Sequence, residues 1–120
     1  MTGAATARDA ATQFMNAVKA QDLMAMGGVW GNSRGPARET LERSDLDARL
    51  VLLQQCYNHD RFQILDDSSA PAGGRIVRVQ ITRGNVTRTP SFRIVTGPSN
   101  RWYVEDTDFA TVQGQFCSPP

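Results

Sequence analysis

The chain has 120 residues, of which 40% are hydrophobic and 21% are charged, and its formal net charge is +1. This length is typical of one domain, so we expect residues 1–120 to form a single domain. A chain so close to neutral gives no electrostatic reason to expect nucleic acid as a partner. No apolar run approaches the length of about 20 residues that a membrane-spanning helix needs, so we expect no membrane span.

The first residues leave the location of the protein open. Met1 to Ala5 lack the basic region and the apolar run of a signal peptide. The sequence as written fits the cytoplasm, whereas a periplasmic or extracellular location is expected if a leader has been removed.

Two helices are predicted near the start of the chain. Thr6-Ala7-Arg8-Asp9 has the pattern of a capping box and predicts the start of the first helix. The apolar positions behind it recur at helical spacing: Ala7, Ala10, Ala11, Phe14, Met15 and Val18. Asp22 is placed to cap a second helix, which Gly27-Gly28 should keep short, since each glycine costs about 1 kcal/mol relative to alanine. Residues 32–36 are expected to form a loop.

A third helix is predicted from about Pro36 or Ser44 to Tyr57. Ser44-Asp45-Leu46-Asp47 offers a cap for the later start. The apolar positions of this helix fall on one face: Leu46, Leu50, Leu53 and Tyr57.

Four strands are predicted after the helices, over residues 61–65, 75–83, 86–95 and 101–109. The second alternates most clearly, with Val77, Val79 and Ile81 on one face. Gly84-Asn85 predicts a two-residue hairpin turn, and Pro90 predicts a bulge or an edge position. The order favours the α+β class, with three N-terminal helices packed on a curved antiparallel sheet of about four strands.

Cys56 and Cys117 are the only cysteines, and His59 is the only histidine. This set fits no zinc-site spacing, so no metal site is expected. If the C-terminal segment folds back over the third helix, the two cysteines can form a disulfide. That bond would close a loop of about 60 residues and stabilise the fold by about 4 kcal/mol. Two unpaired thiols, one of them buried, are the alternative.

Several of these segments together resemble the nuclear transport factor two-like superfamily, also called the cystatin-like α+β cone. The segments are Ala10 to Val18, Asp22-Leu23, Trp30, the late hairpin and Arg101-Trp102-Tyr103-Val104. The chain is most similar to short bacterial members found as exported or lipoprotein-type domains of unknown function. The resemblance implies a cone-shaped fold with a pocket at its open end and a homodimer formed through the sheet.

The same superfamily includes steroid isomerases, epoxide hydrolases, dehydratases and polyketide cyclases, as well as members that only bind ligands or proteins. The chain lacks the His-Asp pairing of the dehydratases and the first-helix tyrosine of the isomerases. His59 beside Asp60 has the composition of a general base, but Asn58-His59-Asp60 is more typical of a solvated helix end. Asp106 and Asp108 alternate on the last strand and are the candidate catalytic acid and base. The alternative is a solvated carboxylate pair near the end of the strand.

The candidate ligand-binding residues are aromatic and basic. Arg78, Arg93 and Arg101 would form a basic stripe for an acidic ligand, or else cross-strand pairs with Asp or Glu. Aromatic side chains would line the pocket, although core packing alone also explains them. The candidates are Trp30, Tyr57, Phe62, Arg78, Phe92 and Trp102.

The nucleophile-elbow, Walker and dinucleotide-binding motifs are absent from the sequence, as are basic-aromatic platforms for RNA. We therefore expect no cofactor and no nucleic acid. The sequence favours a small-molecule binding or protein-interaction domain without clear catalytic machinery, whose ligand is small and apolar or weakly acidic. The first alternative is a small isomerase, hydrolase or cyclase that uses Asp106 or Asp108. A structural role, with the open sheet face as an interface, is the second.

Overall fold

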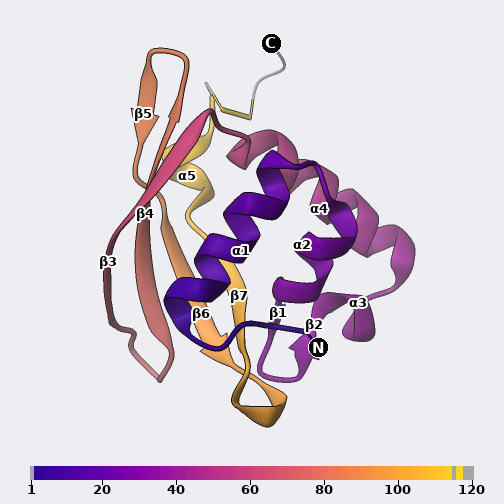
Figure 1. The fold of residues 1–120 in the computed structure, drawn as a ribbon. Coiled ribbons are helices and arrows are strands. Elements are labelled where there is room, and N and C mark those ends of the chain that lie inside the picture. The colour runs from indigo at the N-terminus through magenta and orange to yellow at the C-terminus, as the bar shows by residue number, and fades with distance from the viewer. Residues whose placement is uncertain (1, 115, 118–120) are drawn as a thin grey trace.

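Helices lie on one side of the molecule and a sheet lies on the other (Figure 1). The computed structural model describes residues 2–114, 116 and 117. Within them, the α-helices are α1 (Ala7–Lys19), α2 (Leu23–Val29), α3 (Ala37–Thr40), α4 (Arg43–Tyr57) and α5 (Phe109–Val112), and η1 (Pro98–Asn100) is a short 3-10 helix. The radius of gyration of 13.3 Å is that of a compact chain of this length. The predicted α+β class is confirmed.

The first two helices begin where the sequence predicts. The Thr6 hydroxyl accepts a hydrogen bond of 3.0 Å from the Asp9 amide at the start of α1. The Asp22 carboxylate accepts one of 3.0 Å from the Ala25 amide at the start of α2. The whole predicted apolar stripe of α1 is buried. Gly27 is buried as well, and a Cβ at this position would lie 3.4 Å from the Leu50 side chain, so glycine allows α2 to approach α4 closely.

The third predicted helix is two helices, α3 and α4. Leu41 and Glu42 have extended backbone between them, and Leu41 packs against the core. Ser44 is not the cap, because α4 begins at Arg43 and has no side-chain cap; the Ser44 hydroxyl bonds to the Glu42 carboxylate instead. The end of the helix at Tyr57 is as predicted.

The predicted loop over residues 32–36 contains a small hairpin of β1 (Gly31–Asn32) and β2 (Gly35–Pro36). The Asn32 side chain accepts a hydrogen bond of 2.8 Å from the Arg34 amide in the turn. A Cβ on Gly31 would lie only 2.2 Å from the Gly35 carbonyl oxygen, so this close pairing requires glycine.

The main sheet has five antiparallel strands in the described residues, in place of about four. They are β3 (Arg61–Ser69), β4 (Arg75–Arg83), β5 (Val86–Arg88), β6 (Ser91–Thr96) and β7 (Trp102–Thr107). The order is β3-β4-β6-β7, and β5 pairs with the end of β4. The predicted strand 86–95 is interrupted at Thr89-Pro90, because proline cannot donate to the ladder. The first predicted strand extends to Ser69, and the last ends at Thr107, before α5.

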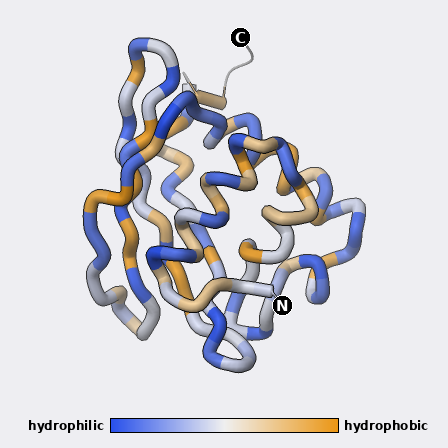
Figure 2. The backbone as a smooth tube through the Cα atoms, viewed as in Figure 1, coloured by the Kyte–Doolittle hydropathy of each residue, from blue (hydrophilic) through white to orange (hydrophobic). Residues whose placement is uncertain are grey.

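The sheet has a covered face and an open face. Its covered face carries Val77, Val79, Ile81, Phe92, Ile94 and Val104, all fully buried in the core with the helices. Hydrophobic and hydrophilic stretches accordingly alternate along the strands (Figure 2). Register shifts at Ile64/Asp66 and at Arg93/Ile94 interrupt the regular pairing and bend the strands.

The two cysteines are joined in a disulfide between α4 and the C-terminal segment, across a sequence separation of 61. This is the first of the two alternatives that the sequence leaves open. Across the described residues, no helix has the length and apolar character needed to cross a membrane.

Candidate functional site

The space between α1, α4 and the sheet is filled by aromatic side chains. The ring centroids of Phe14 and Phe92 are 5.6 Å apart, those of Tyr57 and Phe92 are 5.5 Å apart, and both pairs pack edge to face. All three side chains are fully buried. Tyr57 and Phe92, two of the predicted pocket-lining residues, therefore pack against each other in the core.

The other aromatic candidates surround this cluster. Trp30 is buried with its ring 5.7 Å from that of Phe14. Phe62 and Trp102 are partly buried and pack against the core. Of the six predicted ligand-binding residues, Trp30 alone lines either of the two surface hollows described below.

Among the described residues, the buried hydroxyls of Tyr57 and Thr107 have no hydrogen-bond partner of ordinary geometry. Burial strongly raises the pKa of Tyr57, and the neighbouring Thr107 hydroxyl offsets this only in part. The negative charges of Asp108 and Asp106 raise the pKa further. Tyr57 is therefore a neutral, protonated core residue at ordinary pH.

The structure separates the two candidate catalytic carboxylates. Asp106 is exposed on the open face of the sheet, paired in register with Arg93, and one of its oxygens accepts from the Thr107 amide. Asp108 follows the end of β7 and accepts a hydrogen bond of 2.5 Å from the Thr111 hydroxyl at the start of α5. The residue that points into the core is Thr107, between them. Each carboxylate thus has a local hydrogen-bonding role.

The three arginines predicted to lie on strands are all engaged, although Arg101 comes just before β7. Arg78 bonds to Asp66 through its Nε at 3.0 Å, and Arg93 bonds to Glu105 at 3.1 Å. The Arg78 guanidinium lowers the pKa of the Asp66 carboxyl. These two pairs match the cross-strand alternative of the sequence interpretation. Arg101 instead holds the N-terminal segment by donating to the carbonyl oxygens of Thr2 and Gly3, each at 3.1 Å.

His59 is a buried side chain, only 4% exposed, and not part of a solvated helix end. Its Nδ1 donates to the Tyr57 carbonyl oxygen at 2.9 Å, and its Nε2 has no hydrogen-bond partner in the part of the chain that the structure describes. The ring packs edge-on to Phe62 with 5.3 Å between centroids. Burial lowers the pKa of His59, and the Lys19 charge lowers it further, while the Tyr57 carbonyl and Asp60 act in the opposite direction.

His59 should make the fold less stable in mild acid. Its pKa lies below the ordinary value of about 6.5 only in the folded state, so the unfolded chain binds the proton more readily. The stability that the neutral His59 contributes is fully present above the unfolded pKa of about 6.5, and it is lost as the pH falls toward the lower pKa of the folded state. Urea unfolding from pH 7.5 to 5.5 measures it. The slope of stability against pH should flatten in His59→Asn, which keeps a donor for the Tyr57 carbonyl; an equal slope in both proteins would contradict the assignment.

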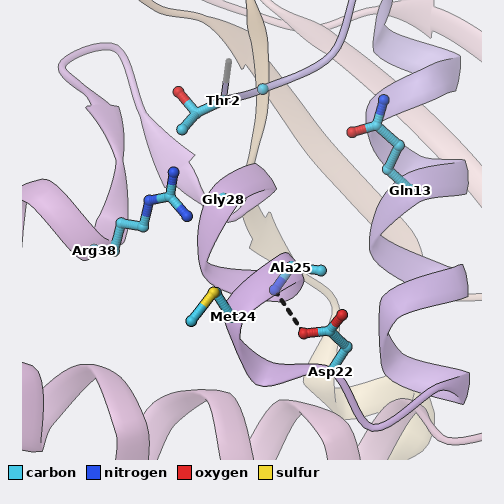
Figure 3. Close-up of a pocket in the computed structure, with 8 residues that line it drawn as sticks. Thr2, Gln13, Asp22, Met24, Ala25, Gly28 and Arg38 are labelled. Atoms are coloured by element: carbon cyan, nitrogen blue, oxygen red, sulfur yellow. Dashed lines mark hydrogen bonds between the residues drawn. The ribbon is translucent and has the colours of Figure 1, made fainter.

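A hollow of about 330 Å³ lies on the helical side of the molecule, between the N-terminal segment, α1, α2 and α3 (Figure 3). We call it the N-terminal groove. Its lining includes Thr2, Gly3, Gln13, Asp22, Met24, Ala25, Gly28 and Arg38. None of the groove residues is among the ligand-binding candidates from the sequence, because they come from four separate segments. Asp22 was expected only to cap a helix, and Gly28 only to keep that helix short.

Arg38 is the cation of the N-terminal groove. Its guanidinium is directed toward Gly28 and Thr2 (Figure 3), and a Cβ on Gly28 would lie 3.6 Å from Nη1. Among the described residues it has no hydrogen-bond or ion-pair partner. Glycine at this position of α2 therefore leaves space beside an unpaired positive charge.

Local structure fixes the walls of the groove. Gly3 has a positive φ of 70°, and its amide donates to the Gly28 carbonyl oxygen at 2.8 Å, which fastens the N-terminal segment to the end of α2. The Thr2 hydroxyl lies 2.8 Å from the Tyr103 hydroxyl. Met24 is 78% exposed on α2, the largest exposure among the large hydrophobic residues described. The groove therefore combines an apolar side chain with a cation.

A second, smaller hollow of about 200 Å³ lies beside Trp30, Arg49 and Glu105. Glu105, the carboxylate of this hollow, is already paired with Arg93. Across residues 2–114, 116 and 117, no group of three or more His, Cys, Asp and Glu side chains is placed to hold a metal ion.

Comparison of the chain with models of protein families, with curated proteins and with solved structures finds no match.

Proposed function

We propose that this chain is a binding domain without catalytic machinery, and that it binds a small weakly acidic molecule in the N-terminal groove. The observation that carries the proposal is the unpaired Arg38 guanidinium beside Gly28 in a hollow of about 330 Å³. An arginine binds a carboxylate through two parallel hydrogen bonds, which gives both strength and orientation.

The composition of the groove supports a small organic acid over an inorganic anion. The exposed Met24 side chain offers an adaptable apolar contact next to the cation. The volume lies at the lower end of the range for small-molecule sites, about 300–1,000 Å³. A ligand with an acidic head and a short hydrocarbon part would use both features.

The position of the carboxylates supports a non-catalytic role. Asp106 faces away from the helices and Asp108 is engaged by Thr111, so the two do not converge on a common cavity. The alternative of an isomerase, hydrolase or cyclase has no observation in its favour here. The homodimer through the open face of the sheet stays a prediction from the sequence.

We also propose that the fold is a distant nuclear transport factor two-like cone. Helices α1 and α2 precede a bulged antiparallel sheet and cover one of its faces, and β4 pairs with both β5 and β6. In this chain the interior of that cone is filled by Phe14, Tyr57 and Phe92. The disulfide supports an exported protein, because disulfides persist mainly in oxidising compartments.

Thermal-shift measurements with short-chain carboxylic acids, such as butyrate and caproate, test the ligand proposal. An acid present at about ten times its dissociation constant should stabilise the fold by about 1.4 kcal/mol, which raises the melting temperature by about 6 °C. Arg38→Gln should weaken that binding about five- to ten-fold, because it removes the charged hydrogen-bond donor.

The matched control is Arg34→Gln, which removes an exposed arginine from the turn between β1 and β2, outside the groove. It should leave acid binding unchanged. Equal weakening in both variants would show a general charge effect and would reject the N-terminal groove as the binding site.

A further inference from the structure

The N-terminal groove contains a negative as well as a positive end. Arg38 lies on one side of the groove, and Asp22 and Gln13 lie on the other, with Met24 and Gly28 between them (Figure 3). No ion pair joins Arg38 to Asp22, although both line the same hollow. The two charges are therefore separated, with α2 between them in this view, and both belong to the lining of the same hollow.

Asp22 has binding capacity beyond its capping role. One carboxylate oxygen accepts the Ala25 amide at 3.0 Å, and the second oxygen has no partner among the described residues. A carboxylate can accept several hydrogen bonds, so this second oxygen is free for a donor on a ligand. The Gln13 side chain also lines the groove, is exposed, and makes no hydrogen bond to any other described residue.

A simple anion would not satisfy both ends. It would be attracted by Arg38 and repelled by Asp22. A molecule with an acidic group and an amino group would instead be attracted by both residues, the acidic group by Arg38 and the amino group by Asp22. We infer that the N-terminal groove selects a small dipolar molecule of the amino-acid type, with its acidic group at Arg38 and its amino group at Asp22. This inference rests on the proposed function and names the class of its ligand.

The middle of the groove can contact the hydrocarbon part of the ligand, which joins its acidic group to its amino group. Met24 provides a flexible apolar contact for methylene groups, and Gly28 has no side chain to block the approach. The geometry thus matches three kinds of contact along one ligand: anionic, apolar and cationic.

Isothermal titration with three probes of equal length tests this inference: ε-aminocaproate, caproate and hexylamine. γ-Aminobutyrate and butyrate repeat the comparison with a shorter spacing. The wild-type protein should bind at least one amino acid about five-fold more tightly than the acid of the same length, the contribution of one exposed charge pair. Arg38→Gln should weaken the binding of the amino acid and of the simple acid by the same factor.

Asp22→Asn separates a binding role from a structural one. Asparagine caps a helix as well as aspartate does, so α2 should remain folded. In this variant the amino acid should bind more weakly and the simple acid more tightly, because the repulsion is removed. The control is Asp45→Asn, because Asp45 is an exposed residue on α4 outside the groove. This variant should bind the amino acid and the simple acid as the wild type does.

The outcomes distinguish the inference from the proposed function. If the simple acids bind as tightly as the amino acids and remain sensitive to Arg38→Gln, the dipolar class is overturned while acid binding stands. If none of the five probes binds, the proposed function fails and the inference fails with it.

Discussion

Replacing Phe92 with alanine should lower the free energy of unfolding by about 3–5 kcal/mol. Phe92 is fully buried on β6, and its ring packs edge to face against both Phe14 and Tyr57. Removing it takes away buried apolar surface and leaves a cavity at the centre of the core. Because small domains are stable by only about 5–15 kcal/mol, the variant should be close to its folding limit. Urea unfolding monitored by circular dichroism measures the loss.

Met24→Ala is the control for this substitution, because Met24 is mostly exposed and should change stability by no more than about 0.5 kcal/mol. A second readout is the response to benzene. A dry apolar cavity of this kind binds benzene, so the ligand should stabilise Phe92→Ala and leave the wild type unchanged. A loss below about 1 kcal/mol, with no response to benzene, would mean that the interior is not packed as described.

Removing the disulfide should cost about 4 kcal/mol, the loop-entropy value for a bond that spans 61 residues of sequence. The bond fixes the C-terminal segment on α4, where Phe116 is buried and its carbonyl oxygen accepts a hydrogen bond of 2.8 Å from Arg83. The double variant Cys56→Ser, Cys117→Ser should therefore melt well below the wild type. Thermal unfolding with and without a reductant measures the difference.

The double variant also controls for the reductant, since it has no thiol to reduce and should melt at one temperature under both conditions. Thiol titration of denatured, unreduced wild type should find no free thiol. Two free thiols would contradict the disulfide and, with it, the argument for an exported protein.

The sequence predicted the features that depend on residues close together in the chain, namely the starts of helices and the buried face of a strand. Thr6 and Asp22 cap α1 and α2 as expected, and the alternation of residues 75–83 gives the buried face of β4. The prediction was wrong where contacts between residues far apart in the chain determine the backbone conformation. The break at Leu41 has no glycine or proline to mark it, and the β1–β2 hairpin depends on backbone contact at Gly31.

The candidate site was harder to predict than the fold, for a physical reason. A sequence gives the type of a side chain, but the partner of that side chain is set by tertiary structure. Phe14, Tyr57 and Phe92 have the composition of a pocket lining, yet they pack on one another. Arg38 is one of twelve arginines, and only the structure shows that it lacks a partner. Gly27-Gly28 was the one available signal, since two glycines weaken a helix unless packing requires them.

Chemical-shift perturbation by NMR tests the central claim most directly, which is that the ligand lies in the N-terminal groove and not in the interior of the fold. Caproate and ε-aminocaproate are titrated into the isotope-labelled protein. The account predicts that the largest amide shifts occur at Gly3, Ala25 and Gly28. Largest shifts at Phe14, Phe92 and Val104 in the core would contradict it, as would the absence of any saturable shift.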